Sequence, residues 1–158
     1  MAQRSTWWTV RAERTVSEDI PGPPEVVRAF YVDLRNIISI HPLVVSVTPA
    51  DPIPNDDGYA QHYRIRDRIA VGPFTISVGY SARVEVPLVG DVYTEARQFP
   101  HVRLDGIVSF DADSGGGTRL TERLIITAPR PIAAFTVREA EKAHQAMLLG
   151  IQAHFAQT

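Results

Sequence analysis

The strongest constraint on the fold is the alternation in residues 74–86, with the sequence FTISVGYSARVEV. Every second residue from Phe74 to Val86 is apolar or aromatic. A two-residue period places these side chains on one face of a β-strand. Because an apolar sheet face must be covered, this segment predicts a sheet packed against a second layer.

Other segments extend the predicted sheet. Alternation or runs of β-branched residues predict further strands at residues 8–16, 43–47, 59–71, 92–99, 102–110 and 118–128. Residues 51–58, DPIPNDDG, predict a loop. The short connections between the later strands favour an antiparallel meander.

Two short helices are predicted after the first strand and one long helix at the end. Residues 21–33, PGPPEVVRAFYVD, open the first helix, and Asp33 or Asn36 could cap a second that runs to about Ile40. Residues 129–158 predict one helix of roughly 27 residues and about 40 Å. Only this helix is long enough to cover the sheet, so we expect a single α+β domain over residues 1–158.

Composition narrows the range of partners. The 16 basic and 18 acidic residues are interspersed, and the formal net charge is −2. This pattern lacks the basic stripe of a nucleic-acid-binding protein. No stretch is apolar for about 18 residues, and the first residues do not resemble a signal peptide, so we expect a cytoplasmic protein without integral membrane contact. The absence of cysteine excludes disulfides and thiolate metal sites.

Four segments resemble a known family. They are IPGPPEVVRAFYVDLRN, HPLV, GYSARV and GTRLTERLIITAPRPI. They are similar to the START-like helix-grip superfamily, also called SRPBCC, and within it to the polyketide cyclase/dehydrase and lipid-transport group. The resemblance implies a curved seven-stranded antiparallel sheet wrapped around the C-terminal helix, with two short helices after the first strand and an elongated apolar cavity. It also implies a small hydrophobic ligand, lipid- or polyketide-like.

Glu122 is the candidate for chemistry. It shares its strand face with Leu120, Leu124 and Ile126, which would point inward. An unpaired carboxylate there would be costly, so we expect Glu122 to be hydrogen-bonded, charge-paired or shifted in pKa. It could serve as a general acid or base or anchor a polar ligand group. Alternatively it lies near the strand end or a bulge and pairs with an arginine at the rim.

Two histidines lie on apolar helix faces. His41 ends the stripe formed by Leu34, Ile37 and Ile38, and we predict that it lies at the cavity opening. Alternatively it is a partly buried residue bonded to backbone carbonyls. His144 is predicted at the core or cavity edge, because its spacing to other histidines does not fit a metal site.

The predicted cavity lining combines apolar residues with a few polar ones. Tyr63 and Tyr80 could orient a ligand, or their hydroxyls could bond neighbouring carbonyls. Gly79 and Gly106 lie inside strands and could allow the sheet to bend. The predicted ligand-binding residues are Phe30, His41, Tyr63, Phe74, Ile76, Val78, Tyr80, Leu104, Phe110, Glu122, His144, Met147 and Ile151.

Three functions are consistent with these observations. The first is binding, transport or sensing of a small hydrophobic molecule in the cavity. The second is an enzyme of the polyketide cyclase or aromatase kind that uses an acid–base group such as Glu122. The third is a non-catalytic partner-binding module with a closed cavity. No metal or cofactor is predicted, and the oligomeric state stays open between monomer and homodimer.

Overall fold

The computed structural model describes residues 7–158 as one antiparallel sheet with a long helix against it. The strands are β1 (Thr9–Ile20), β2 (Val44–Pro49), β3 (Ile53–Asn55), β4 (Gly58–Val71), β5 (Phe74–Pro87), β6 (Val92–Gln98), β7 (Val102–Ala112) and β8 (Thr118–Pro129). The helices are α1 (Pro24–Val32), the one-turn 3₁₀ helix η1 (Leu34–Ile37) and α2 (Arg130–Ala156).

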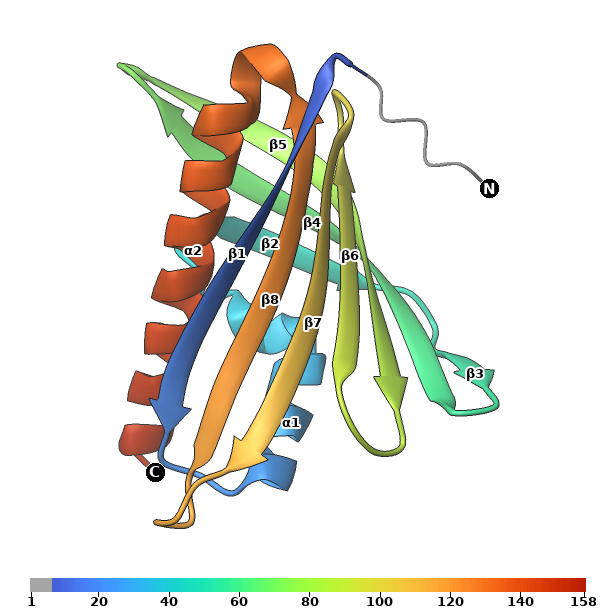
Figure 1. The fold of residues 1–158 in the computed structure, drawn as a ribbon, viewed down its shortest axis with the longest axis vertical. Helices are drawn as coiled ribbons and strands as arrows, with labels where there is room; N and C mark the ends of the chain where they lie inside the picture. Colours follow the sequence, from blue (N-terminus) through green and yellow to red (C-terminus); the bar gives the residue numbers. More distant parts are fainter. Residues whose placement is uncertain (1–6) are drawn as a thin grey trace.

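Seven strands form a continuous path in the order β1-β8-β7-β6-β5-β4-β2, and all their pairings are antiparallel. The sheet curls, so that β4 and β5 run diagonally to β1 and β8 (Figure 1). The long helix α2 lies alongside β1 and follows β8 directly (Figure 1). The predicted α+β helix-grip architecture is therefore confirmed.

The segment predicted as a loop at residues 51–58 contains one additional strand. Ile53 pairs with Ala60, and Asn55 pairs with Gly58, so β3 forms a short hairpin on β4. This prediction was wrong because prolines argued against a strand. At the edge of a sheet, however, a proline removes only a backbone donor that faces away from the partner strand.

The core lies between the concave face of the sheet and α2, and it follows the predicted alternation. In β8, every second residue from Thr118 to Ala128 is buried. The side chains of β8 and α2 that are at most 2% exposed include Leu120, Leu124, Leu148 and Ile151. The apolar positions predicted to share one face thus form the interior.

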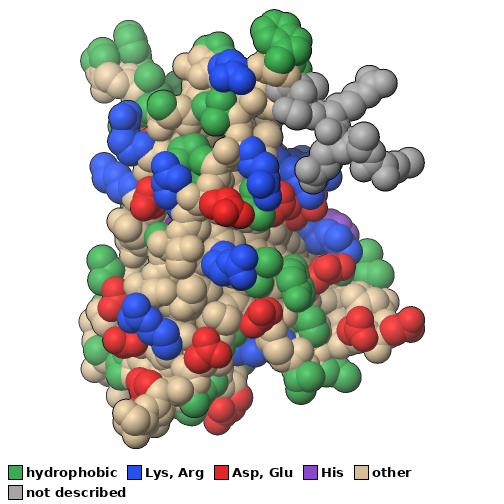
Figure 2. All heavy atoms as spheres, viewed as in Figure 1, with side chains coloured by type: hydrophobic (Ala, Val, Ile, Leu, Met, Phe, Trp, Pro, Cys, Tyr) green, Lys and Arg blue, Asp and Glu red, His purple; other side chains and the backbone are tan. Residues whose placement is uncertain are grey.

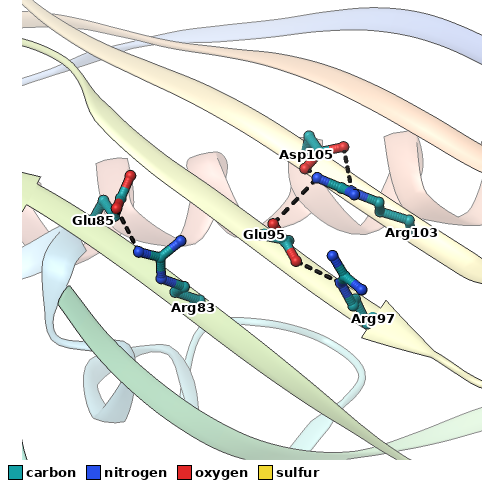
Figure 3. Close-up of polar contacts among 6 residues, drawn as sticks. All are labelled: Arg83, Glu85, Glu95, Arg97, Arg103 and Asp105. Atoms are coloured by element: carbon teal, nitrogen blue, oxygen red, sulfur yellow. Dashed lines mark hydrogen bonds and ion pairs between the residues drawn. The ribbon is translucent and has the colours of Figure 1, made fainter. Parts of the chain in front are cut away.

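The opposite face of the sheet is polar. Ion pairs lie along β6 and β7, with Arg97 and Glu95 2.5 Å apart and Arg103 and Asp105 2.9 Å apart, and Arg103 also pairs across the two strands with Glu95 at 3.2 Å (Figure 3). Acidic and basic side chains are interspersed over the face seen in Figure 2. Such exposed pairs each contribute about 0–1 kcal/mol, so they define the solvent face more than they stabilise the fold.

The connection after α1 brings a loop against the long helix. Asp33 caps η1 by accepting a hydrogen bond from the Arg35 backbone N–H at 3.1 Å, as predicted, but η1 ends at Ile37. A Cβ atom on Gly150 of α2 would overlap the side chain of Ile40 and make a tight contact with its carbonyl oxygen. A glycine is therefore needed here for the loop to approach α2, which also brings His41 to the helix.

No helix in residues 7–158 is both long enough and apolar enough to cross a membrane.

Candidate functional site

A cavity of about 320 Å³ lies between the inner face of the sheet, α2 and the η1 segment. Its wall follows α2 from Ile132 to Met147, roughly 20 Å of helix. Five of its lining residues are also exposed to solvent: Val71, Ile76, Arg83, Pro100 and Phe135. Arg83 is exposed on the outer face of β5, and the other four place the opening between the β4–β5 hairpin, the β6–β7 turn and the first turns of α2.

Most of the wall is aliphatic. Five strands, β4 to β8, contribute side chains to the wall, and the helix contributes alanines that leave space between α2 and the sheet. Representative members are Ile65, Ile69, Val78, Leu104, Ile126, Ala140 and Ala143. The alanines of α2 are thus too small to fill the space between the helix and the branched side chains of the strands.

A hydrogen-bonded chain of three residues runs behind the polar part of this wall. Glu122 is completely buried. The Tyr31 hydroxyl of α1 donates to Glu122 Oε1 at 2.5 Å, and His144 Nδ1 of α2 lies 2.6 Å from Glu122 Oε2. Both carboxylate oxygens are thus bonded, which is the condition for a buried carboxylate to be tolerated.

Glu122 determines the protonation of its two partners. Burial lowers the pKa of His144, but the charge and hydrogen bond of Glu122, with a smaller contribution from Asp67, raise it above its ordinary value of 6.5. Burial, followed by the charge and hydrogen bond of Glu122, raises the pKa of Tyr31 well above 10. Because Nδ1 of His144 is engaged by Glu122, Nε2 is the ring nitrogen available to a bound molecule.

A second polar pair lines the same cavity. Asp67 on β4 is 7% exposed, and its carboxylate accepts a hydrogen bond from the Tyr80 hydroxyl on β5. Burial raises the pKa of Asp67 to about 6, although Tyr80 and then the charge of His144 act against the shift. Burial, and then Asp67, raise the pKa of Tyr80 far above its ordinary value.

His41 lies in the cavity wall beside His144. The two rings are edge to face with centroids 6.1 Å apart, and His41 Nδ1 accepts a hydrogen bond from the Leu43 backbone N–H at 3.2 Å. Burial, followed by the charge of His144, lowers the pKa of His41 to about 4. The ring is therefore neutral near pH 7, with its proton on Nε2.

Many of the residues predicted for the site do meet at the cavity. Its lining includes His41, Ile76, Val78, Tyr80, Leu104, His144 and Met147. The position of His41 differs from the prediction, because the solvent-exposed lining residues place the opening between the β4–β5 hairpin, the β6–β7 turn and the first turns of α2.

The other predicted residues are not part of the lining. Phe30 stacks on His154, and Phe74 is 71% exposed because it lies at the tip of the β4–β5 hairpin. Phe110 packs against Tyr31, Ile151 is fully buried in the core, and Glu122 lies behind His144.

Tyr63 also lies outside the lining. Its hydroxyl donates to the Val32 carbonyl at 3.2 Å, so it bonds a neighbouring carbonyl and does not face the cavity.

Two polar residues of the site are absent from the predicted set. Asp67 lies between Ile65 and Ile69 on the inner face of β4, the same signal that identified Glu122 on β8. Tyr31 belongs to the apolar stripe of α1, and its sequence position gives no sign that its hydroxyl reaches Glu122. Within residues 7–158, no three His, Asp or Glu side chains are arranged to hold a metal ion.

Comparison with known proteins gives structural likenesses only. No family model matches the sequence, and no curated protein matches it. A Thermus thermophilus protein of known structure has 22% identity and a TM-score of 0.67, with 94% of this chain and 97% of that chain covered.

Two further solved structures are similar in fold at low sequence identity. The di-domain aromatase/cyclase StfQ of the steffimycin biosynthetic pathway has 10% identity and a TM-score of 0.74, with 94% of this chain and 51% of that chain covered. A START superfamily protein from Mycobacterium smegmatis has 14% identity and a TM-score of 0.65, with 93% and 97% covered. The chain has the START-like helix-grip fold.

Proposed function

We propose that this protein binds a small, largely hydrophobic molecule in the cavity between the sheet and α2, as a carrier or sensor. The observation that carries the proposal is the combination of a mostly aliphatic wall with a few polar side chains gathered around His144. Ligand sites of this kind use the apolar wall for affinity and the polar groups for orientation. The structural likeness to a START superfamily protein supports the same class of function.

A fluorescent probe tests this proposal. N-phenyl-1-naphthylamine is small and apolar, and it becomes bright when it leaves water. We expect saturable binding of one probe per protein. Val78→Trp fills part of the cavity, because Val78 lines it. The matched control is Ser81→Trp, since Ser81 lies three residues away on the exposed face of the same strand.

The expected result is a loss of about tenfold or more in affinity in Val78→Trp, because a bulky side chain removes apolar contact area from the probe. Ser81→Trp should bind as the unsubstituted protein does. Absence of binding, or equal binding by Val78→Trp, would overturn the proposal.

A second candidate is an acid–base enzyme of the aromatase/cyclase kind, as StfQ is described. The buried pair of Glu122 and His144 favours it, because a carboxylate orients the imidazole while Nε2 remains available. His144 would then be the catalytic residue, and Glu122 would position it. In this candidate mechanism Glu122 acts indirectly, through His144, and is not itself the acid or base.

Proton exchange distinguishes this candidate from simple binding. The protein is incubated in D₂O with 2-acetylnaphthalene, and loss of the methyl ketone hydrogens is followed by NMR. In the neutral form of His144, Nε2 would take a C–H proton to give the enolate, and a deuteron would return to the carbon. Exchange that is accelerated by the protein and lost in His144→Gln supports catalysis. Binding without acceleration leaves only the carrier function.

The third function, a partner-binding module with a closed cavity, has no supporting observation. The gap between sheet and helix is open enough to hold a small molecule.

A further inference from the structure

Asp67 presents a buried polar atom without a partner in the middle of the cavity wall. The residue is 7% exposed, it lines the cavity, and its Oδ1 atom has no hydrogen-bond partner among residues 7–158. Almost all buried polar groups in proteins are hydrogen-bonded, because an unpaired one costs about 1–3 kcal/mol. A carboxylate that lines a cavity and has a buried, unpaired oxygen is therefore a candidate contact for a bound molecule.

The neighbouring side chains do not relieve this cost. Arg66 and Arg68 flank Asp67 in sequence, but both are exposed on the opposite face of β4. Tyr80 donates to Asp67, and its single hydroxyl proton is used in that bond. The second carboxylate of the site, Glu122, already has both oxygens bonded. Asp67 is thus the unsatisfied acceptor of this group.

Donors face the same part of the cavity. His41 carries its proton on Nε2, since Nδ1 accepts from Leu43. His144 can donate through Nε2 when protonated, and its charge interacts with that of Asp67. A molecule bound here can therefore donate a hydrogen bond to Asp67 and accept one from either histidine. A hydroxyl group satisfies both needs, because it donates one hydrogen bond and accepts others.

We propose that Asp67 Oδ1 is a subsite for a hydroxyl group of the ligand, which donates to Asp67 while it accepts from Nε2 of His144 or His41. The ligand class is a hydrophobic alcohol or phenol whose hydroxyl-bearing part lies beside α2. This inference rests on the proposed binding function and specifies its ligand. An ammonium group would satisfy Asp67 but would leave the histidine donors unpaired, because it has no acceptor.

Three probes with one naphthalene body test the subsite by calorimetry at pH 7.5. They are 2-naphthol, 2-methoxynaphthalene and 2-(aminomethyl)naphthalene, which present a hydroxyl, an ether acceptor and an ammonium group. Asp67→Asn keeps the shape of the side chain and can still accept from Tyr80. The matched control is Asp105→Asn, because Asp105 pairs with Arg103 on the outer face of the sheet (Figure 3).

The unsubstituted protein should bind 2-naphthol about tenfold more tightly than 2-methoxynaphthalene, the ratio expected from one hydrogen bond to a charged acceptor. In Asp67→Asn the ratio should fall close to one, whereas Asp105→Asn should retain it. Equal affinities in the unsubstituted protein, a preference that persists in Asp67→Asn, or tightest binding of the amine would overturn the subsite while binding itself stands. Failure of all three probes to bind would overturn the binding function as well.

Discussion

Glu122 Oε2 and His144 Nδ1 lie 2.6 Å apart and join the interior of β8 to the middle of α2. The pair has two consequences. It satisfies a completely buried carboxylate, and it orients the imidazole so that Nε2 is left for the cavity. Tyr31 of α1 donates to the same carboxylate, so the three bonded residues come from three elements, α1, β8 and α2, that are far apart in the sequence. The polar centre of the cavity is therefore also part of the core.

Glu122→Gln should lower the pKa of His144. The carboxylate charge and hydrogen bond of Glu122 are what raise that pKa against the effect of burial, and the amide removes the charge. We also expect a loss of about 2 kcal/mol in the free energy of unfolding, the typical contribution of a hydrogen bond to a charged group. NMR titration of the His144 ring measures the first effect, and chemical denaturation measures the second.

Glu141→Gln is the matched control, since Glu141 is a partly exposed carboxylate three residues from His144 that pairs with Arg14. A His144 pKa that is the same in Glu122→Gln and Glu141→Gln would contradict the role given to Glu122.

Tyr31→Phe should destabilise the protein more than Tyr63→Phe does. Removing the Tyr31 hydroxyl leaves Glu122 Oε1 buried without a donor, at a cost of about 1–3 kcal/mol or more because the acceptor is charged. Tyr63 donates to the neutral Val32 carbonyl at 3.2 Å, so its loss should cost about 1 kcal/mol. Urea denaturation of the two variants measures the difference, and a larger loss in Tyr63→Phe would show that the Tyr31 bond is not important for stability.

Asp67→Asn should be more stable than the unsubstituted protein at neutral pH and equally stable near pH 4. Burial raises the folded-state pKa of Asp67 to about 6, whereas an unfolded aspartate titrates near 3.9. Between these values the folded state binds the proton more readily, so stability falls as pH rises from about 4 to 6, and the full cost remains above pH 6. We expect a gain of about 1–2 kcal/mol at pH 7.5, because the uncharged amide avoids this cost.

The quantity to measure is the difference in the free energy of unfolding between Asp67→Asn and the unsubstituted protein, because the titration of His41 changes stability with pH in the opposite direction. Its folded-state pKa of about 4 lies below the unfolded value near 6.5, so its contribution to stability is lost as pH falls through that range. Denaturation curves of both proteins at intervals from pH 4 to 7.5 isolate the effect of Asp67. A stability difference that does not change with pH would rule out the raised pKa.

Gly150→Ala should destabilise the protein although alanine favours a helix. The new Cβ would overlap Ile40, which packs on α2 next to His41. In the Ile40→Ala background the overlapping methyl group is gone, so Gly150→Ala should there be neutral or stabilising by up to about 1 kcal/mol. Thermal denaturation of the four proteins completes the cycle, and additive effects of the two substitutions would disprove the close contact.

The fold could be predicted from the sequence because its strands bury one face. Alternation in β5 and β8 is a local signal, and it placed Tyr80 and Glu122 inward correctly. The same signal at Asp67 was available, because this residue lies between Ile65 and Ile69 on β4. Burial patterns thus indicate which way a side chain points.

Which inward residues meet each other could not be predicted in the same way. The distance from Tyr31 to Glu122 depends on how α1 packs beneath β7 and β8, and that packing is not encoded in any short segment. Likewise, Phe74 continues the apolar alternation of β5 but lies beyond the end of the core, at the hairpin tip. Strand length relative to the covering helix decides such cases.

The most direct test of a ligand within the cavity uses the methionine methyl groups. The protein has two methionines, Met1 and Met147, and only Met147 lines the cavity among the described residues. With ¹³C-methyl methionine, titration with 2-naphthol should shift the Met147 signal and give nuclear Overhauser effects between its methyl group and the naphthalene ring. Saturable binding of 2-naphthol with an unchanged Met147 signal would contradict the proposed site.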